Sequence, residues 1–174
     1  VTGLSQYEPG LDGYTVFTKP MDEYDLDEAR RQIYGSVEPK VKTPEVPAVQ
    51  LSAEELAELQ YPALERLKTM LGELGPDTRK IMLFVPYHWY HQATPGSKDA
   101  LVWNECKRRV VELASGHPNA YVVDFMINSD ITTTDENYWD HVHYTVEIAA
   151  QLVSLMAGAI MDGKRDERFE LLYP

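Results

Sequence analysis

The residues best suited to chemistry lie in the segment Tyr138–Glu147, which reads YWDHVHYTVE. Asp140 precedes His143 by three residues, just before an expected helix that Thr145 can cap. A turn of that length can fold the carboxylate back onto the imidazole, where it would accept the Nδ1 proton and fix the tautomer. The other ring nitrogen would then be free to take a proton from a hydroxyl group. We therefore predict that His143 is a general base and Asp140 its orienting acid. The plainer alternative is an aspartate that only bonds locally at the start of a helix.

Three more histidines, His88, His91 and His141, lie in loops that we expect beside this segment. Their H-x-x-H and H-x-H spacings would allow a metal site with an oxygen ligand from Asp124 or Asp140. Histidines in surface loops are more often simply solvated, so we expect neither a metal nor another cofactor.

Aromatic side chains in the same loops could form a floor for a sugar ring. Trp89, Tyr90 and Trp139 are the residues concerned, although such side chains more often cover the edge of a core. The candidate substrate contacts are His88, His91, Trp89 and Trp139.

The elements that would position these residues follow one another from residue 52 onward. Ser52 and Glu55 fit a capping box, and the helical spacing that follows is broken by Pro62, either as a kink or as the first turn of a second helix. Two continuous apolar runs predict buried strands, and a helix capped by Ser97 separates them. In chain order we expect a helical region over 52–74, a strand at Ile81–Val85, a helix from Ser97 to Gly116, a strand at Tyr121–Met126 and a helix from about Val146 to Met161.

This alternation predicts an α/β fold with a small parallel sheet between helices. In such sheets, chemistry takes place beyond the carboxyl ends of the strands. The loops Pro86–Gly96 and Asn128–Tyr144 leave those ends, and they hold four of the five histidines. We therefore expect the two loops to converge and to form the site.

The first 50 residues differ from the rest of the chain. They hold five prolines and no lasting apolar period apart from a short helical stretch near Asp25–Ile33. The stretch Ser36–Gln50 is typical of an extended connector. We therefore divide the chain into an irregular, Pro-rich segment (1–50), which wraps the globule or packs on a partner chain, and an α/β domain (51–174).

Composition narrows the class of protein. The chain has 174 residues, with 28 aspartates and glutamates against 16 lysines and arginines, and a formal net charge of −12. This balance argues against a non-specific nucleic-acid binder and against docking on an anionic membrane. No apolar run approaches the ~20 residues that a membrane span needs. The single cysteine, Cys106, excludes an intrachain disulfide and fits a core position.

The motif at Asp140 resembles the last motif block of the SGNH/GDSL-type hydrolases. That block is D-x-x-H followed by an aromatic or aliphatic residue, Thr or Ser, one more residue and Glu, and here it reads Asp140-His141-Val142-His143-Tyr144-Thr145-Val146-Glu147. The pair Tyr138-Trp139 and the triplet Pro86-Tyr87-His88 are similar to a cell-envelope branch related to alginate O-acetyltransferases. The resemblance covers about residues 51–161. It implies a flavodoxin-like three-layer fold, of which this chain would hold a part, and an esterase or O-acyltransferase acting on a polysaccharide or acyl-ester substrate. It also implies a periplasmic or cell-envelope location, with Asp140 and His143 as the acidic and basic members of a triad.

The chain departs from that family at the nucleophile. The family carries its serine in a Gly-Asp-Ser or Gly-x-Ser block after the first strand, and no such block is recognisable here. The nearest serine, Ser36, follows a helical pattern, and Ser5 has no strand before it. Because three expected strands are also missing, we expect the nucleophile to lie upstream of Val1 and the chain alone to be nearly inactive. The alternative is a non-catalytic module of the cell envelope that binds a glycan or a protein. The sequence indicates no oligomeric state.

Overall fold

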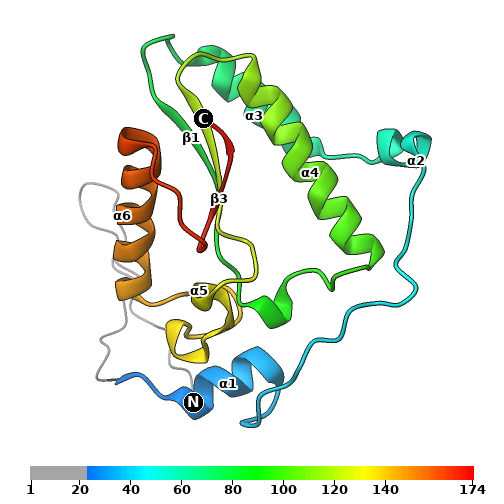
Figure 1. The fold of residues 1–174 in the computed structure, drawn as a ribbon, viewed down its shortest axis with the longest axis vertical. Helices are drawn as coiled ribbons and strands as arrows, with labels where there is room; N and C mark the ends of the chain where they lie inside the picture. Colours follow the sequence, from blue (N-terminus) through cyan, green and yellow to red (C-terminus); the bar gives the residue numbers. More distant parts are fainter. Residues whose placement is uncertain (1–22) are drawn as a thin grey trace, which may run out of the picture.

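Two parallel strands joined by a helix form the centre of the fold in the computed structural model, which describes residues 23–174 (Figure 1). Strand β1 (Lys80–Phe84) and strand β2 (Ala120–Asp124) pair in parallel, with Lys80 opposite Ala120 and Phe84 opposite Asp124. Helix α4 (Lys98–Ser115) provides the crossover that a parallel pair requires. Both strands overlap the two predicted apolar runs.

A third strand corrects the expectation of a purely parallel sheet. Strand β3 (Glu170–Tyr173) pairs antiparallel with β2, with an irregularity between Val122 and Val123, so the sheet is mixed and its order is β1-β2-β3. Helix α6 (Val146–Asp162) ends at Gly163, which is left-handed with φ 65°, and the chain then returns along the sheet. β2 is therefore central and almost fully buried, whereas β1 is an edge strand and Ile81 on it is 45% exposed.

Helices cover both faces of the sheet, which confirms the three-layer arrangement (Figure 1). On one face α6 packs Ile148, Leu152 and Ala159 against Val123 and its neighbours. On the other face α4 and helix α3 (Pro62–Glu73) pack on Val122. Alternate side chains of β2 thus pack into two separate cores, one on each face of the sheet, as expected for a strand buried on both sides.

The helix starts follow the predicted capping residues. Ser52 and Glu55 form a capping box for helix α2 (Ala53–Glu58), and Pro62 occupies the first turn of α3, so the break at Pro62 separates two helices. The Ser97 hydroxyl accepts a hydrogen bond from the Ala100 amide at the start of α4. Short elements complete the loops after the strands: η2 (Trp89–His91), α5 (Asp130–Thr133) and η3 (Asp135–Asn137).

The described part of the N-terminal segment packs on the α/β unit. Helix α1 (Leu26–Tyr34) is capped by Asp25 and ends at Gly35, and its Ile33 and Tyr34 form a small core with Tyr138. The extended residues after it cross to the start of α4. The division of the chain at residue 50 stays a prediction, and Ser5 lies outside the described residues. Between residues 23 and 174, none of the helices combines the length and apolarity needed to cross a bilayer.

Candidate functional site

The two loops that leave the carboxyl ends of β1 and β2 meet, as the topology predicts. The backbone amide of His88 donates to the carbonyl of His141 at 2.9 Å. The Tyr138 hydroxyl donates to the carbonyl of Pro86 at 3.0 Å. The rings of His91 and His141 stack with their centroids 4.3 Å apart. Backbone and side-chain contacts therefore hold the loops together where they pack against α1.

Asp140 and His143 form a closed pair within one turn. Asp140 Oδ2 lies 2.7 Å from His143 Nδ1, and its Oδ1 accepts the backbone amides of Val142 and His143, each at 2.8 Å. Burial would raise the pKa of Asp140, but these amides and the imidazole outweigh it and hold the pKa below its usual range. Because an ionised carboxylate only accepts, the Nδ1 atom of a neutral His143 must carry the proton.

The outer side of the His143 ring faces solvent. The His143 side chain is 75% exposed, whereas that of Asp140 is 29% exposed. The turn is closed on both sides, because the Trp139 amide donates to the His143 carbonyl at 2.8 Å and Tyr138 bridges to Tyr144. This geometry leaves Nε2 as an unprotonated nitrogen on a fixed ring, which is what a general base requires.

The family nucleophile has no counterpart beside this ring. Among residues 23–174, no serine hydroxyl is hydrogen-bonded to His143, and Ser36 instead donates to the carbonyl of Glu38 at 2.9 Å. A nucleophile upstream of Val1 stays a prediction.

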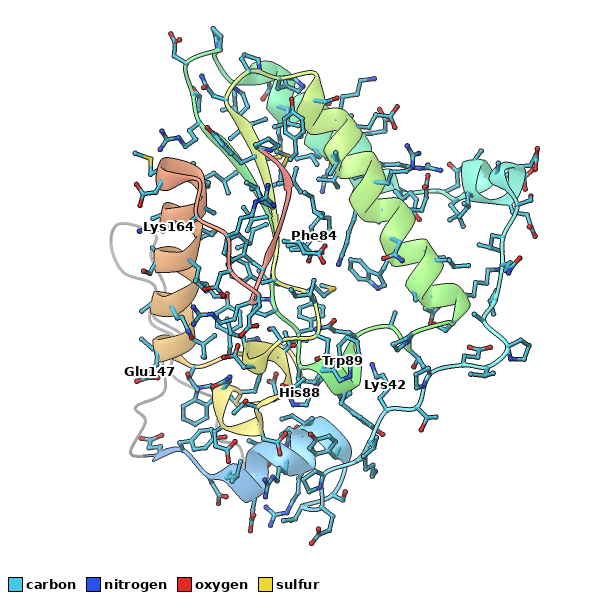
Figure 2. All side chains as sticks on the ribbon, viewed as in Figure 1. Lys42, Phe84, His88, Trp89, Glu147 and Lys164 are labelled. Carbon is cyan, nitrogen blue, oxygen red and sulfur yellow. The ribbon has the colours of Figure 1, made fainter. Side chains whose placement is uncertain are left out.

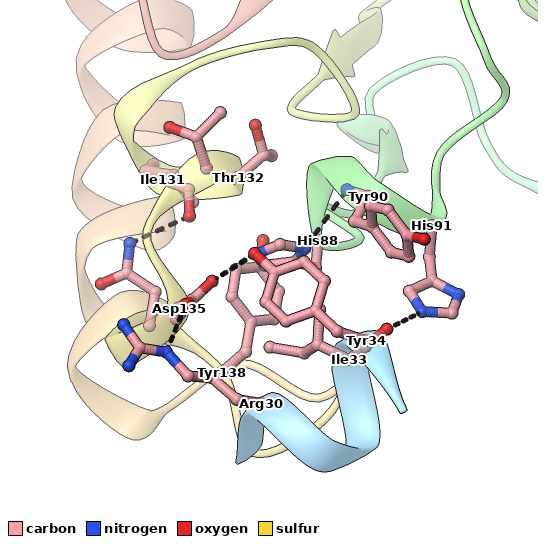
Figure 3. A network of polar contacts seen from close by, with 12 residues as sticks. Arg30, Ile33, Tyr34, His88, Tyr90, His91, Ile131, Thr132, Asp135 and Tyr138 are labelled. Carbon is pink, nitrogen blue, oxygen red and sulfur yellow. Dashed lines mark hydrogen bonds and ion pairs between the residues drawn. The ribbon is translucent and has the colours of Figure 1, made fainter. Parts of the chain in front are cut away.

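A second Asp–His pair, which no pattern in the sequence predicts, lies inside the protein (Figure 3). His88 is 2% exposed, its Nε2 lies 3.2 Å from Asp135 Oδ1, and its Nδ1 accepts the Tyr90 amide at 3.2 Å. The Asp135 carboxylate also accepts from the Tyr34 hydroxyl at 2.6 Å and from Arg30 Nε at 2.7 Å. Asp135 therefore joins α1 to both loops.

The electrostatics of this inner network follow from its burial. Burial lowers the pKa of His88, and this effect exceeds the opposing attraction of Asp135. Burial would raise the pKa of Asp135, but hydrogen bonds from Tyr34 and Arg30 lower it overall. The network therefore favours a neutral His88 beside a charged Asp135.

The predicted substrate contacts are dispersed by the fold. His88 is enclosed with both ring nitrogens engaged, which suits a role in positioning the loops rather than contact with a ligand. Lys42 and Trp89 lie side by side (Figure 2), with the Lys42 Nζ atom 5.4 Å from the centroid of the Trp89 ring. Trp139 packs edge-on against Tyr24, with centroids 5.1 Å apart. His91 Nε2 donates to the carbonyl of Ile33, and His91 also lines a pocket at the start of α4.

The carboxylate at the end of β2 is used within the fold. Asp124 is 1% exposed, and it pairs with Lys107 of α4 and accepts the Met126 amide at 2.8 Å. Burial raises its pKa despite the lysine. Nowhere in the described part of the chain do three His, Cys, Asp or Glu side chains gather so as to hold a metal ion.

Comparisons with known proteins gave no match to this chain, whether to protein-family models, to curated proteins or to solved structures.

Proposed function

We propose that this chain carries the acid–base pair of an SGNH-like esterase or O-acyltransferase, with His143 as the general base and Asp140 as its orienting acid. The observation that carries the proposal is the 2.7 Å contact between Asp140 Oδ2 and His143 Nδ1 on a ring whose side chain is 75% exposed. The resemblance of the D-x-x-H segment to the last motif block of that family supports the same assignment.

The chemistry requires one proton to move twice. His143 Nε2 takes the proton of an attacking hydroxyl, and the hydroxyl oxygen adds to the carbonyl carbon of the ester. Collapse of the tetrahedral intermediate breaks the bond to the leaving alcohol, and the imidazolium returns the proton to that alcohol. Asp140 keeps the ring in the tautomer that this sequence needs and stabilises the imidazolium between the two transfers. A polysaccharide or acyl ester of the cell envelope is the substrate class that the resemblance implies.

The test measures hydrolysis of p-nitrophenyl acetate by the purified chain and by its His143→Gln variant. We expect slow release of p-nitrophenolate, because none of the serines between residues 23 and 174 is hydrogen-bonded to His143. In the variant the protein-dependent rate should fall by at least about tenfold, at the low end for general acid–base catalysis. His117→Gln is the matched control, because His117 lies in the turn before β2 and should leave the rate unchanged.

Two other outcomes are informative. An unchanged rate in His143→Gln would contradict the proposal and favour a non-catalytic module that binds a glycan or a protein. This second candidate draws on the finding that no serine hydroxyl between residues 23 and 174 is bonded to His143. Rapid multiple turnover that Ser36→Ala abolishes would keep the pair catalytic but show that the nucleophile is inside this chain.

A further inference from the structure

A pocket of about 550 Å³ lies between the N-terminal strap, defined here as residues 43–49, and the start of α4. Its volume is within the roughly 300–1,000 Å³ that is usual for small-molecule sites. The strap provides one wall, and the loop after β1 with the first turns of α4 provides the other. The lining residues are Thr43, Glu45, His91, Gln92, Ala93, Thr94, Ser97, Asp99, Val102 and Trp103.

The walls are held in place before any ligand arrives. The Glu45 amide donates to the carbonyl of Pro95, and the Val49 amide donates to the carbonyl of Gly96, each at 2.8 Å. Gly96 has φ 84°, and a Cβ added there would lie 2.5 Å from the Glu45 carbonyl oxygen. Only glycine allows the strap to approach so closely. On the loop side, Gln92 Nε2 donates to the Tyr87 carbonyl at 2.8 Å.

The lining combines one aromatic face with many hydrogen-bond acceptors. Trp103 is 38% exposed, so part of its side chain is open to solvent. Asp99 precedes it by one helical turn and therefore lies on the same side of α4. The carboxylates of Asp99 and Glu45 take part in none of the ion pairs between described residues, and no lysine or arginine lines the pocket.

We propose that this pocket binds an uncharged sugar unit, stacked on Trp103 and hydrogen-bonded through its hydroxyls to Asp99, Glu45 and the neighbouring threonines. Two unpaired carboxylates without a lining cation repel phosphates and acidic sugars. An organic cation is less favoured, because Glu45 and Asp99 are exposed and such ion pairs gain little in water. A sugar can stack its ring on the indole face and at the same time donate hydrogen bonds from its hydroxyls to the acceptors.

His91 links the pocket to the turn that holds the Asp140–His143 pair. His91 lines the pocket, and its ring stacks on that of His141, which lies between Asp140 and His143 in the chain. A sugar in the pocket would therefore contact a residue, His91, that also packs on the turn of the pair. That this sugar belongs to an ester substrate rests on the proposed function, whereas the binding of a sugar in the pocket does not.

The test titrates the chain with three uncharged oligosaccharides, cellotetraose, xylotetraose and mannotetraose, and follows the indole Nε1–H signal of Trp103 by NMR. We expect at least one of them to shift this signal with a Kd of about 1 mM or tighter. For the Trp103→Ala variant, binding is measured by saturation transfer to the saccharide. The affinity should fall by at least about tenfold, the loss typical of an aromatic anchor. Trp103→Phe should restore part of it. Met70→Ala, which removes an apolar side chain that is 62% exposed on α3, is the matched control and should bind as the unaltered chain does.

Failure of all three oligosaccharides to shift the Trp103 signal would overturn the inference. So would a stronger shift with spermidine, as a cation, or with tetragalacturonate, as an acidic sugar. His143→Gln separates this result from the proposed function, because it should slow the ester reaction at least about tenfold and leave sugar binding intact.

Discussion

The molecule holds two Asp–His pairs within the same two loops, and they differ mainly in burial. In the inner pair, His88 and Asp135 have side chains that are 2% and 7% exposed, with 3.2 Å between Nε2 and Oδ1. In the outer pair, His143 and Asp140 are 75% and 29% exposed, with 2.7 Å between Nδ1 and Oδ2. The inner histidine has partners on both nitrogens, whereas the outer one has a partner on Nδ1 only.

This difference separates a structural role from a chemical one. The Asp135 carboxylate contacts three side chains from two segments, namely Arg30 and Tyr34 of α1 and His88 of the loop after β1, so its charge holds α1 and the loops together. Asp140 accepts only from its own turn, which leaves its imidazole partner fixed but accessible. The same two residue types thus become part of a core or part of a site according to what surrounds the second ring nitrogen.

The largest expected effect is on stability, from Asp135→Asn. This change removes the charge that Arg30, Tyr34 and His88 share at a buried site. Breaking one member of a buried charged network costs about 3 kcal/mol or more, so urea denaturation should show a loss of that size in the free energy of unfolding. Asp140→Asn is the matched control and should cost less than about 1 kcal/mol, as exposed pairs do. Equal losses in both variants would remove the distinction between the pairs.

The second expected effect is on the rate of ester hydrolysis. Here Asp140 matters more than Asp135, the reverse of their expected effects on stability. In Asp140→Asn the side chain can still accept the backbone amides but no longer requires a proton on His143 Nδ1. We expect the His143-dependent hydrolysis of p-nitrophenyl acetate to fall about tenfold, which corresponds to ~1.4 kcal/mol of barrier. Long-range ¹H–¹⁵N NMR should show more of the tautomer that is protonated on Nε2. A variant with unchanged rate and tautomer would show that Asp140 does not orient the ring.

The local parts of this comparison could be predicted from the sequence. Asp140 and His143 are three residues apart, so one turn brings them together whatever the rest of the chain does. The starts of three helices could be predicted from their capping residues, Ser52, Ser97 and Thr145. A cap is also a local contact, because it joins residues only three positions apart.

The non-local parts could not be predicted. His88 and Asp135 are 47 residues apart, and Asp135 and Arg30 are 105 apart, so their contacts depend on how the sheet brings the loops together. Asp135 stands in a polar loop with no feature to distinguish it from Asp130. Strand β3 could not be predicted because Glu170–Tyr173 is short and has no strand pattern of its own, and its pairing depends on the edge of β2.

The smallest expected effect is a pH dependence that belongs to the inner pair. Burial lowers the pKa of His88 below its ordinary value of 6.5, so the unfolded chain binds a proton on this ring at a higher pH than the folded protein does. The free energy of unfolding must therefore fall as the pH drops from 6.5 towards the lowered value, with no further contribution below it. The slope is at most about 1.4 kcal/mol per pH unit for one proton. The stabilising charge of Asp135 is lost only below its ordinary value of 3.8, so it does not contribute in this range.

Denaturation at about pH 7.5 and about pH 5.5 brackets the range in which His88 acts. The difference between the two free energies of unfolding should be smaller in His88→Gln than in the unaltered chain, even though the variant is less stable at both values. His117→Gln, which leaves the inner network intact, should keep the full difference. If His88→Gln kept it as well, the pH dependence would come from elsewhere. The inner pair would then be only a set of hydrogen bonds, without the protonation preference that its burial implies.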